Sequence, residues 1–369
     1  MPTAMPTTSP QDRPTLRVIA RAGKVSVGTV SLALRDNPLI ARETRARIKA
    51  LAAKMGYRPD PRVAKLMSYL QQHKRRNTGE TLAYVTAFAQ AEVWMESVTW
   101  SNYFAGAQAK AAELGYRVEH FWLRAPGVTE RSFSRVMHSR GIQGLLIPPV
   151  PHSHSRMAID WSRFSTVAFG YSLHEPRVNR VVHNHFYTIT TALTVLRSRG
   201  YERIGLAISP YHDDRVANLW SAGFLTFKTV VDPKHTVPLY RGPIEAKPLL
   251  QWFRQHRPDA ILSDDLSTVN ILGKAGYRVP HDCGFVSLDW HEHTRLFSGI
   301  DQHSADLGAA AAKNVIGALQ RDEFGVPARP ETLMIEGSWV EGASLPVLKG
   351  TVPSTDALKA TWSDRDTWQ

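Results

Sequence analysis

From Thr81 onward, short apolar runs alternate with amphipathic stretches, and this alternation restricts the possible folds more than any other feature of the sequence. The run 144–147 is apolar throughout, which is typical of a strand buried on both faces of a sheet. Residues 187–199 instead carry apolar side chains three or four positions apart and end at Gly200, as expected for a helix. Strands that alternate with helices in this way predict parallel β-sheets with crossover helices.

The alternating elements form two consecutive sets. In the first set we expect strands at 82–88, 117–123, 144–147 and 164–170, with helices at 103–114 and 129–139. In the second set, which begins near Arg180, we expect strands at 204–208, 260–262 and 284–288, with helices at 187–199, 219–230, 268–275 and 307–319. Two such sets predict two parallel-sheet lobes, and ligands bind open sheets of this kind at the carboxyl ends of the strands.

A different pattern occupies the first sixty residues. Thr15 and Ser26 are suitable N-cap residues, and they precede two short segments with helical apolar spacing, 16–22 and 27–34. A glycine-containing turn separates the two segments, and a third helix is expected at 42–55. Two short helices joined by a tight turn indicate a helix-turn-helix, whose second helix enters the major groove of DNA.

The charge distribution supports a nucleic-acid partner for this region. Residues 1–80 hold 16 Lys and Arg against 5 Asp and Glu, so 11 of the 12 net positive charges of the chain lie there. The rest of the chain is nearly neutral. A basic module attached to a neutral body is the electrostatic footprint of phosphate binding, and a plain three-helix bundle would not need it.

The segment Val-Ser-Val-Gly-Thr-Val-Ser at 25–31 resembles the lac-repressor (LacI/GalR) family of transcription regulators. The resemblance continues through Glu43-Thr44-Arg45, Gly56-Tyr57-Arg58-Pro59 and Leu66. It implies that Thr29 and Ser31 contact phosphates, that Val27, Gly28 and Leu32 face base edges, and that Leu66 wedges into the minor groove from a hinge helix. The complete set of DNA-contacting residues expected here is Thr15, Arg17, Ser26, Val27, Gly28, Thr29, Ser31, Leu32, Arg35, Arg62 and Leu66.

Three features depart from the family pattern. Leu32 stands where the family usually has Arg, and Gly28 replaces a larger or polar residue, so this part of the helix lacks a bidentate guanine reader. The family's turn glycine falls on Lys24, where a left-handed backbone would cost about 1 kcal/mol unless the turn is re-formed. Ala41 replaces a polar N-cap of the third helix, a loss of about 1 kcal/mol.

A weaker resemblance extends to about Gly342, over short matches such as 200–204 and 299–302. It implies an effector domain like a periplasmic sugar-binding protein, with an effector pocket between the lobes. The effector-binding residues that it implies are Trp100, Arg215, Asn218, Trp220, Asp265, Asp289 and Gln302. Trp220 stands where many sugar-binding members have Arg, and Asn184 stands where Asp is common. These departures favour an oligosaccharide or glycoside that offers a broad stacking face, or a molecule other than a sugar.

Together these features predict an N-terminal all-α helix-turn-helix domain plus an α/β, periplasmic-binding-protein-like domain of two parallel-sheet lobes. We expect a disordered lead-in at 1–14, the helix-turn-helix domain at 15–59, and a hinge helix and linker at 60–80. The two-lobed effector-binding and dimerisation domain follows at 81–343, and a flexible tail at 344–369.

Enzymatic and metal-binding alternatives receive less support. The three His-x-His pairs at 152/154, 183/185 and 291/293 could each offer two metal ligands on a strand, but no Cys or Glu completes a site beside them, and pocket-lining or solvated histidines are favoured. The nucleophile-elbow, P-loop and dinucleotide-binding motifs are absent from the sequence. We therefore predict no catalytic residues, no metal and no cofactor.

The sequence favours a DNA-binding repressor that is controlled by a small-molecule effector, with a carbohydrate as the expected class. One helix-turn-helix reads only half a site, so a homodimer on a near-palindromic operator in double-stranded DNA is expected. A single cysteine and the lack of a signal peptide or a long apolar run suit a cytoplasmic protein without a membrane partner. The alternative is a solute-binding module or a sugar-modifying enzyme with a basic N-terminal extension.

Overall fold

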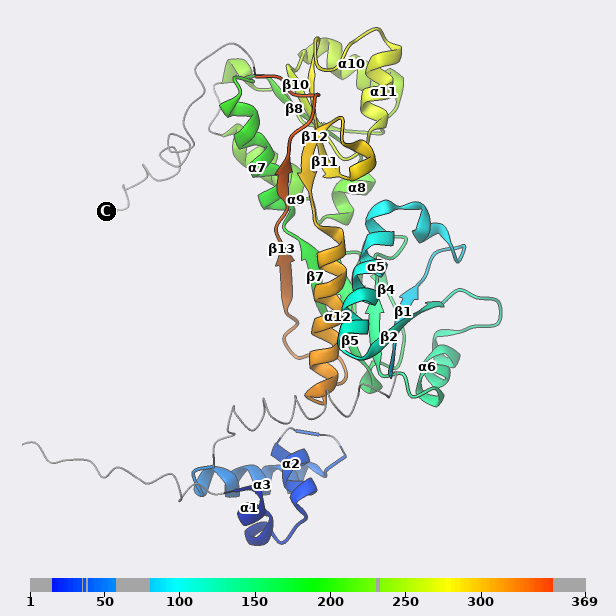
Figure 1. Cartoon of the computed structure of the whole chain (residues 1–369), viewed down its shortest axis with the longest axis vertical. Helices are drawn as coiled ribbons and strands as arrows, with labels where there is room; N and C mark the ends of the chain where they lie inside the picture. Colours follow the sequence, from blue (N-terminus) through cyan, green and yellow to red (C-terminus); the bar gives the residue numbers. More distant parts are fainter. Residues whose placement is uncertain (1–14, 35, 38, 58–79, 230–232, 348–369) are drawn as a thin grey trace, which may run out of the picture.

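The computed structural model describes residues 15–34, 36, 37, 39–57, 80–229 and 233–347 (Figure 1). Several predictions lie outside these residues: the lead-in at 1–14, Arg35, the hinge segment with Arg62 and Leu66, and the tail beyond 347.

The N-terminal region folds into three helices, α1 (Leu16–Gly23), α2 (Val27–Leu34) and α3 (Arg42–Lys54). Ile19, Val30 and Ile48 are fully buried between them, as the apolar spacing of the sequence predicts. Ser26 begins α2 as an N-cap, because its Oγ accepts a hydrogen bond of 3.0 Å from the Thr29 N–H. Thr15 has the extended backbone of an N-cap, but its side chain makes no capping hydrogen bond.

The turn between α1 and α2 has Lys24 as its left-handed residue. Gly23 is the last residue of α1, and a Cβ at this position would lie 2.8 Å from Ile48 Cδ1. A larger residue at position 23 would therefore displace the end of the Ile48 side chain, and the left-handed position falls on the next residue, whose φ is 52°. The third helix ends as predicted, with Gly56 at a φ of 70° and a hydrogen bond from the Tyr57 N–H to the Ala52 carbonyl.

Two six-stranded sheets form the body of the chain, one in each lobe. In the first lobe the strand order is β13-β7-β5-β3-β1-β2, and all neighbours are parallel. Its strands are β1 (Glu80–Thr86), β2 (Tyr116–Trp122), β3 (Gly144–Ile147), β5 (Ser165–Phe169), β7 (Asn179–His183) and β13 (Thr332–Ile335). Helices α5 (Val98–Glu113), α6 (Glu130–Ser139) and α12 (Ser304–Gln320) belong to the same lobe (Figure 1).

In the second lobe the order is β14-β12-β11-β10-β8-β9, parallel except for the pair β12 and β14. The strands are β8 (Ile204–Ile208), β9 (Tyr240–Arg241), β10 (Ala260–Ser263), β11 (Gly284–Trp290), β12 (Ser298–Asp301) and β14 (Ser338–Val340). The helices are α7 (His185–Ser198), α8 (Pro210–Arg215), α9 (Leu219–Lys228), α10 (Ala246–His256) and α11 (Ser267–Lys274). The predicted α/β architecture of two parallel-sheet lobes is therefore confirmed.

The chain crosses between the lobes three times: from β7 to α7, from β12 to α12, and from β13 to β14. Hydrogen bonds tie these crossover segments together. The Asn184 N–H donates to the Ile335 carbonyl at 2.8 Å, and the Ser338 hydroxyl lies 2.9 Å from His303 Nε2. Three linked segments at one place form a hinge, the type of connection about which domains close around ligands.

Several elements differ from their predicted bounds. Helix α5 begins at Val98, five residues earlier than expected, because Ser97 Oγ caps it by accepting from the Trp100 N–H. The sequence pattern did not indicate β7, α8, β9, α10, β12, β13 or β14 as regular elements. Strands β13 and β14 are short and only partly buried, and the apolar run 333–335 of β13 has too few residues to indicate a strand.

The predicted start of the tail at residue 344 is too early. Ser344 and Leu345 are buried, and the Tyr201 hydroxyl donates to the Pro346 carbonyl at 2.9 Å. The two-lobed domain therefore continues through at least Pro346. In the described part of the chain, no helix combines the length and the apolar character needed to cross a membrane.

Candidate functional site

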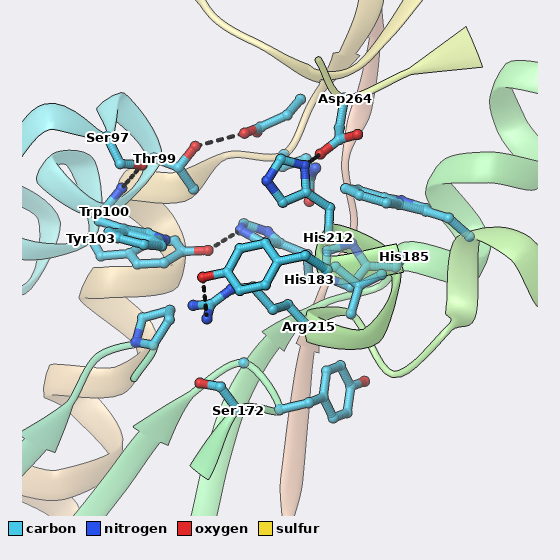
Figure 2. Close-up of a pocket in the computed structure, with 18 residues that line it drawn as sticks. Ser97, Thr99, Trp100, Tyr103, Ser172, His183, His185, His212, Arg215 and Asp264 are labelled. Carbon is cyan, nitrogen blue, oxygen red and sulfur yellow. Dashed lines mark hydrogen bonds and ion pairs between the residues drawn. The ribbon is translucent and has the colours of Figure 1, made fainter. Parts of the chain in front are cut away.

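A cavity of about 350 Å³ lies between the two lobes, next to the hinge (Figure 2). It opens at the carboxyl ends of strands from both sheets, where binding sites of open α/β sheets occur. The first lobe contributes Ser97, Thr99, Trp100, Tyr103, Pro149, Gly170, Tyr171, Ser172 and His183. The second lobe contributes His185, Tyr211, His212, Arg215, Val216, Trp220, Asp264, Asp289 and Gln302.

Five of the seven predicted effector-binding residues line this cavity: Trp100, Arg215, Trp220, Asp289 and Gln302. The other two do not. Asn218 turns away and accepts a hydrogen bond of 2.8 Å from Arg241 Nη2. Asp265 faces an adjacent, shallower depression, and its Oδ1 accepts from the Ser267 N–H at 2.8 Å. Its neighbour Asp264 lines the cavity instead, because consecutive side chains at a strand end point in opposite directions.

Arg215 connects the lobes at one wall of the cavity. Its Nη1 donates to the Val150 carbonyl at 2.7 Å and to the Pro151 carbonyl at 3.2 Å, both in the first lobe. The guanidinium carbon also lies 5.3 Å from the centre of the Trp100 ring, a cation–π distance. Phe88 stacks on Trp100, with ring centres 5.0 Å apart. Arg215 therefore uses part of its donor capacity to hold the lobes together.

A second interlobe contact joins Thr99 of α5 to Asp289 of β11. The Thr99 hydroxyl donates to Asp289 Oδ2 at 2.7 Å and lies 3.0 Å from His291 Nε2. Burial disfavours the carboxylate, but the hydrogen bonds and charge from His291, together with Thr99, outweigh it and lower the pKa of Asp289. Asp289 is thus ionised at neutral pH, and its buried Oδ1 has no hydrogen-bond partner among the described residues.

Asp264 and His212 form a further pair within the second lobe. His212 Nδ1 lies 2.6 Å from Asp264 Oδ2, and this hydrogen bond raises the pKa of His212 (Figure 2). Burial raises the pKa of Asp264 more than the imidazole lowers it. The pair adds an imidazole and a carboxyl group to the lining of the cavity.

The cavity floor is made of neutral aromatic rings. Burial lowers the pKa of His183 to about 4 and that of His185 well below its usual value, so both imidazoles are uncharged at pH 7. His183 Nε2 lies 2.8 Å from the Tyr103 hydroxyl, and the His185 and Trp220 rings meet edge to face with centres 4.9 Å apart. In the described ranges, no group of three or more His, Cys, Asp or Glu side chains could hold a metal ion.

Several residues of this cavity were not predicted from the sequence. His183 and His185 carried a signal, since they form one of the His-x-His pairs, and the structure places both in the wall as pocket-lining residues. No sequence pattern indicated that Tyr103, Tyr171 and Tyr211 line the cavity, because they come together only through the packing of three separate segments. Asp264 could have been found by asking which of two adjacent strand-end carboxylates faces the ligand.

Eight of the eleven expected DNA-contacting residues lie in the described part of the chain. Thr15, Arg17, Ser26, Val27 and Gly28 are exposed, whereas Thr29, Ser31 and Leu32 are half-buried. Basic side chains also surround α2, with Lys24 exposed in the turn before it and Arg21 exposed in α1. These residues are accessible to a DNA duplex. Their contact with DNA stays a prediction.

Replacing Arg215 with methionine should weaken lobe closure. The substitution keeps the apolar stem against Trp100 but removes the charged donor to the two carbonyls, and a hydrogen bond to a charged group contributes about 1.5–3 kcal/mol. Small-angle scattering should show a larger radius of gyration for the variant. Arg278→Met, at an exposed arginine that pairs only with Asp282 in its own lobe, is the control and should leave the value unchanged. Equal radii for both variants would contradict the role of Arg215 as an interlobe contact.

Comparisons with known proteins match both parts of the chain. Residues 15–60 match the model of bacterial regulatory proteins of the lacI family, and residues 193–345 match the model of a periplasmic binding protein-like domain. A comparison with curated proteins finds no match.

Solved structures show the same fold. A transcriptional regulator CelR–cellobiose complex matches with a TM-score of 0.53 at 17% identity, over 90% of this chain and 100% of that one. The lac repressor dimer bound to operator and the anti-inducer ONPF matches with a TM-score of 0.54 at 18% identity, over 90% and 99%. The LacI family regulator CCPA from Weissella paramesenteroides with bound glucose matches with a TM-score of 0.53 at 12% identity, over 73% and 100%. At these identities the likeness concerns the fold.

Proposed function

Because the chain belongs to the lacI family of bacterial regulatory proteins, we propose that it is a transcriptional repressor whose operator binding is controlled by a carbohydrate effector. The family is one of DNA-binding regulators, so the proposal assigns no catalytic reaction. The observation that carries the proposal is the cavity between the lobes, lined by aromatic rings and by buried polar atoms without partners among the described residues.

The chemistry of the cavity fits a polyhydroxylated ligand. Asp289 Oδ1 and Gln302 Oε1 are unpaired acceptors in the described structure, and Trp220 Nε1 is an unpaired donor. Sugar hydroxyl groups can satisfy both kinds of atom, and the aromatic side chains that line the cavity can pack against the C–H groups of a sugar ring. The volume of about 350 Å³ lies at the small end of ligand pockets. Similar structures contain cellobiose, glucose or sucrose, which supports the same ligand class.

The site also lies where a ligand can influence the hinge. His183 and Gln302 belong to or adjoin two of the three crossover segments, and Asp289 and Trp100 come from different lobes. A ligand that contacts all of them binds open and closed lobes with different affinities, and it can shift that equilibrium only by this difference. We propose that the shift repositions the DNA-binding domains of the two protomers and releases the operator.

We also propose that the protein is a homodimer and that it acts in the cytoplasm, where the chromosome of a bacterium is accessible. A helix-turn-helix contacts one half-site, so a two-fold axis supplies the second half of a near-palindromic operator. The similarity to a lac repressor dimer bound to operator supports this arrangement.

The test combines three measurements on the full chain. Sites are first selected from a pool of random duplex DNA, and a gel shift with the selected site is then repeated with cellobiose, glucose and sucrose. We expect a shifted protein–DNA complex that dissociates when one class of sugar is added. Sedimentation should show a dimer at micromolar concentration. Sugar binding without any DNA complex would favour the alternative of a solute-binding module. A protein that stays monomeric with and without operator would contradict the dimer.

A further inference from the structure

The second helix of the helix-turn-helix has an unusual surface for a DNA reader. Helix α2 has the sequence VGTVSLAL and contains no charged residue, no Asn and no Gln. Val30 and Ala33 face the core, which leaves Val27, Gly28, Thr29, Ser31 and Leu32 at or near the surface. Bidentate recognition of a base pair in the major groove needs Arg or Lys for guanine, Asn or Gln for adenine, or a carboxylate for cytosine. None of these groups is present on α2.

Gly28 is not required by the fold. Apart from the backbone of its own helix, a Cβ at this position would have only Ser26 Oγ within 4 Å, at 3.6 Å, which is an ordinary contact. The backbone of Gly28 is also not in the left-handed region. Because glycine weakens a helix relative to alanine, its presence on the exposed side of α2 needs another reason. The absence of a side chain allows a partner to approach the helix backbone closely.

Apolar side chains lie near Gly28 on the same helix. Val27 is 41% exposed and Leu32 is half-buried, so neither side chain is fully buried in the core. The C5-methyl group of thymine is the apolar group that a base edge presents in the major groove. We propose that α2 reads its operator through thymine methyl groups, with Val27 and Leu32 contacting methyls while Gly28 lets the helix backbone approach the base edges. This inference rests on the proposed function, since it specifies how the proposed operator is recognised.

The consequence is a half-site in which A·T pairs occupy the positions below α2. A methyl group buried against Val27 or Leu32 should contribute about fourfold in affinity, from the usual value of apolar burial. The affinity for random DNA should be set instead by the basic residues around the helix, because phosphate contacts do not depend on sequence.

The test removes single methyl groups from the DNA. Each thymine of the selected site is replaced in turn by deoxyuridine, which lacks only the C5-methyl, and affinities are measured by gel shift with the full chain. We expect a severalfold loss at one or more thymines per half-site. Val27→Ala should abolish the effect at the thymine that Val27 contacts. Val18→Ala, at a similarly exposed valine of α1, is the matched control and should leave every deoxyuridine effect unchanged.

Two further variants separate recognition from folding. Gly28→Ala should keep or raise the melting temperature of the N-terminal domain while lowering the affinity for the selected site severalfold. Leu32→Arg should create a preference for guanine at one position, because it adds the bidentate reader that α2 lacks. Affinity that is insensitive to every deoxyuridine replacement, or a selected site with G·C pairs at the positions that respond to α2 substitutions, would overturn the inference. If no sequence is enriched from the random pool, the operator proposal itself fails before the thymine test begins.

Discussion

Replacing Asp289 with alanine should strongly weaken the response of the protein to its effector and leave operator binding intact. Asp289 is an ionised carboxylate of the second lobe that accepts from Thr99 of the first lobe, lines the cavity, and has a second oxygen without a partner among the described residues. A hydrogen bond from a ligand hydroxyl to such a charged group contributes about 1.5–3 kcal/mol, so effector affinity should fall by roughly 10- to 150-fold. Operator binding should persist, because the expected DNA-contacting residues belong to a separate domain.

The measurement is a ligand titration followed by tryptophan fluorescence, since Trp100 and Trp220 line the cavity, together with a gel shift at each ligand concentration. Asp265→Ala is the control. That residue lies at the end of the neighbouring strand, but its side chain bonds to the Ser267 N–H and does not line the cavity. An Asp289→Ala protein that responds with normal affinity would remove this carboxylate from the effector site. Loss of the response in Asp265→Ala alone would move the site to the adjacent depression.

The fold could be predicted from the sequence where the signal is local. Strand β8 has the bounds that the sequence predicts, 204–208, because a short apolar run between a glycine turn and a polar loop has few other interpretations. The cap at Ser26 and the stop at Gly56 were likewise predicted, because capping depends on neighbouring residues. Strands β13 and β14 could not be recognised, since they add to sheet edges by backbone hydrogen bonds that need no particular side chains.

The candidate site was predictable only in part, for a geometric reason. The sequence indicates which residues follow a strand, but it does not say which way each side chain points. Asp264 and Asp265 differ by one position, and only Asp264 faces the cavity between the lobes. Arg215 was expected to contact the effector, and the structure shows that it also holds two carbonyl groups of the other lobe. Contacts of this kind join residues 64 and 65 positions apart, so no local pattern reveals them.

Replacing Gly106 with alanine should strongly destabilise the two-lobed domain. Gly106 of α5 and Gly308 of α12 face each other's helix: a Cβ on Gly106 would lie 1.9 Å from the Ala305 carbonyl oxygen, and one on Gly308 would lie 2.0 Å from the Tyr103 carbonyl oxygen. The two helices thus pack backbone against backbone. An added methyl group must push them apart and open voids along the interface, so we expect a loss of about 3 kcal/mol or more in the free energy of unfolding.

Thermal and denaturant unfolding measure this loss, and a matched substitution isolates its cause. Gly273 lies within α11, and a Cβ added there would meet no atom within 4 Å beyond the backbone of its own helix, so Gly273→Ala should be neutral or stabilise the domain by up to about 1 kcal/mol. The two variants carry the same chemical change in a helix and differ only in the space around it. Because α12 directly follows the hinge segment that contains Gln302, the Gly106 variant should also lose part of its effector response at temperatures where it remains folded. Equal stability of the two variants would mean that α5 and α12 can separate without cost, which their backbone contact does not permit.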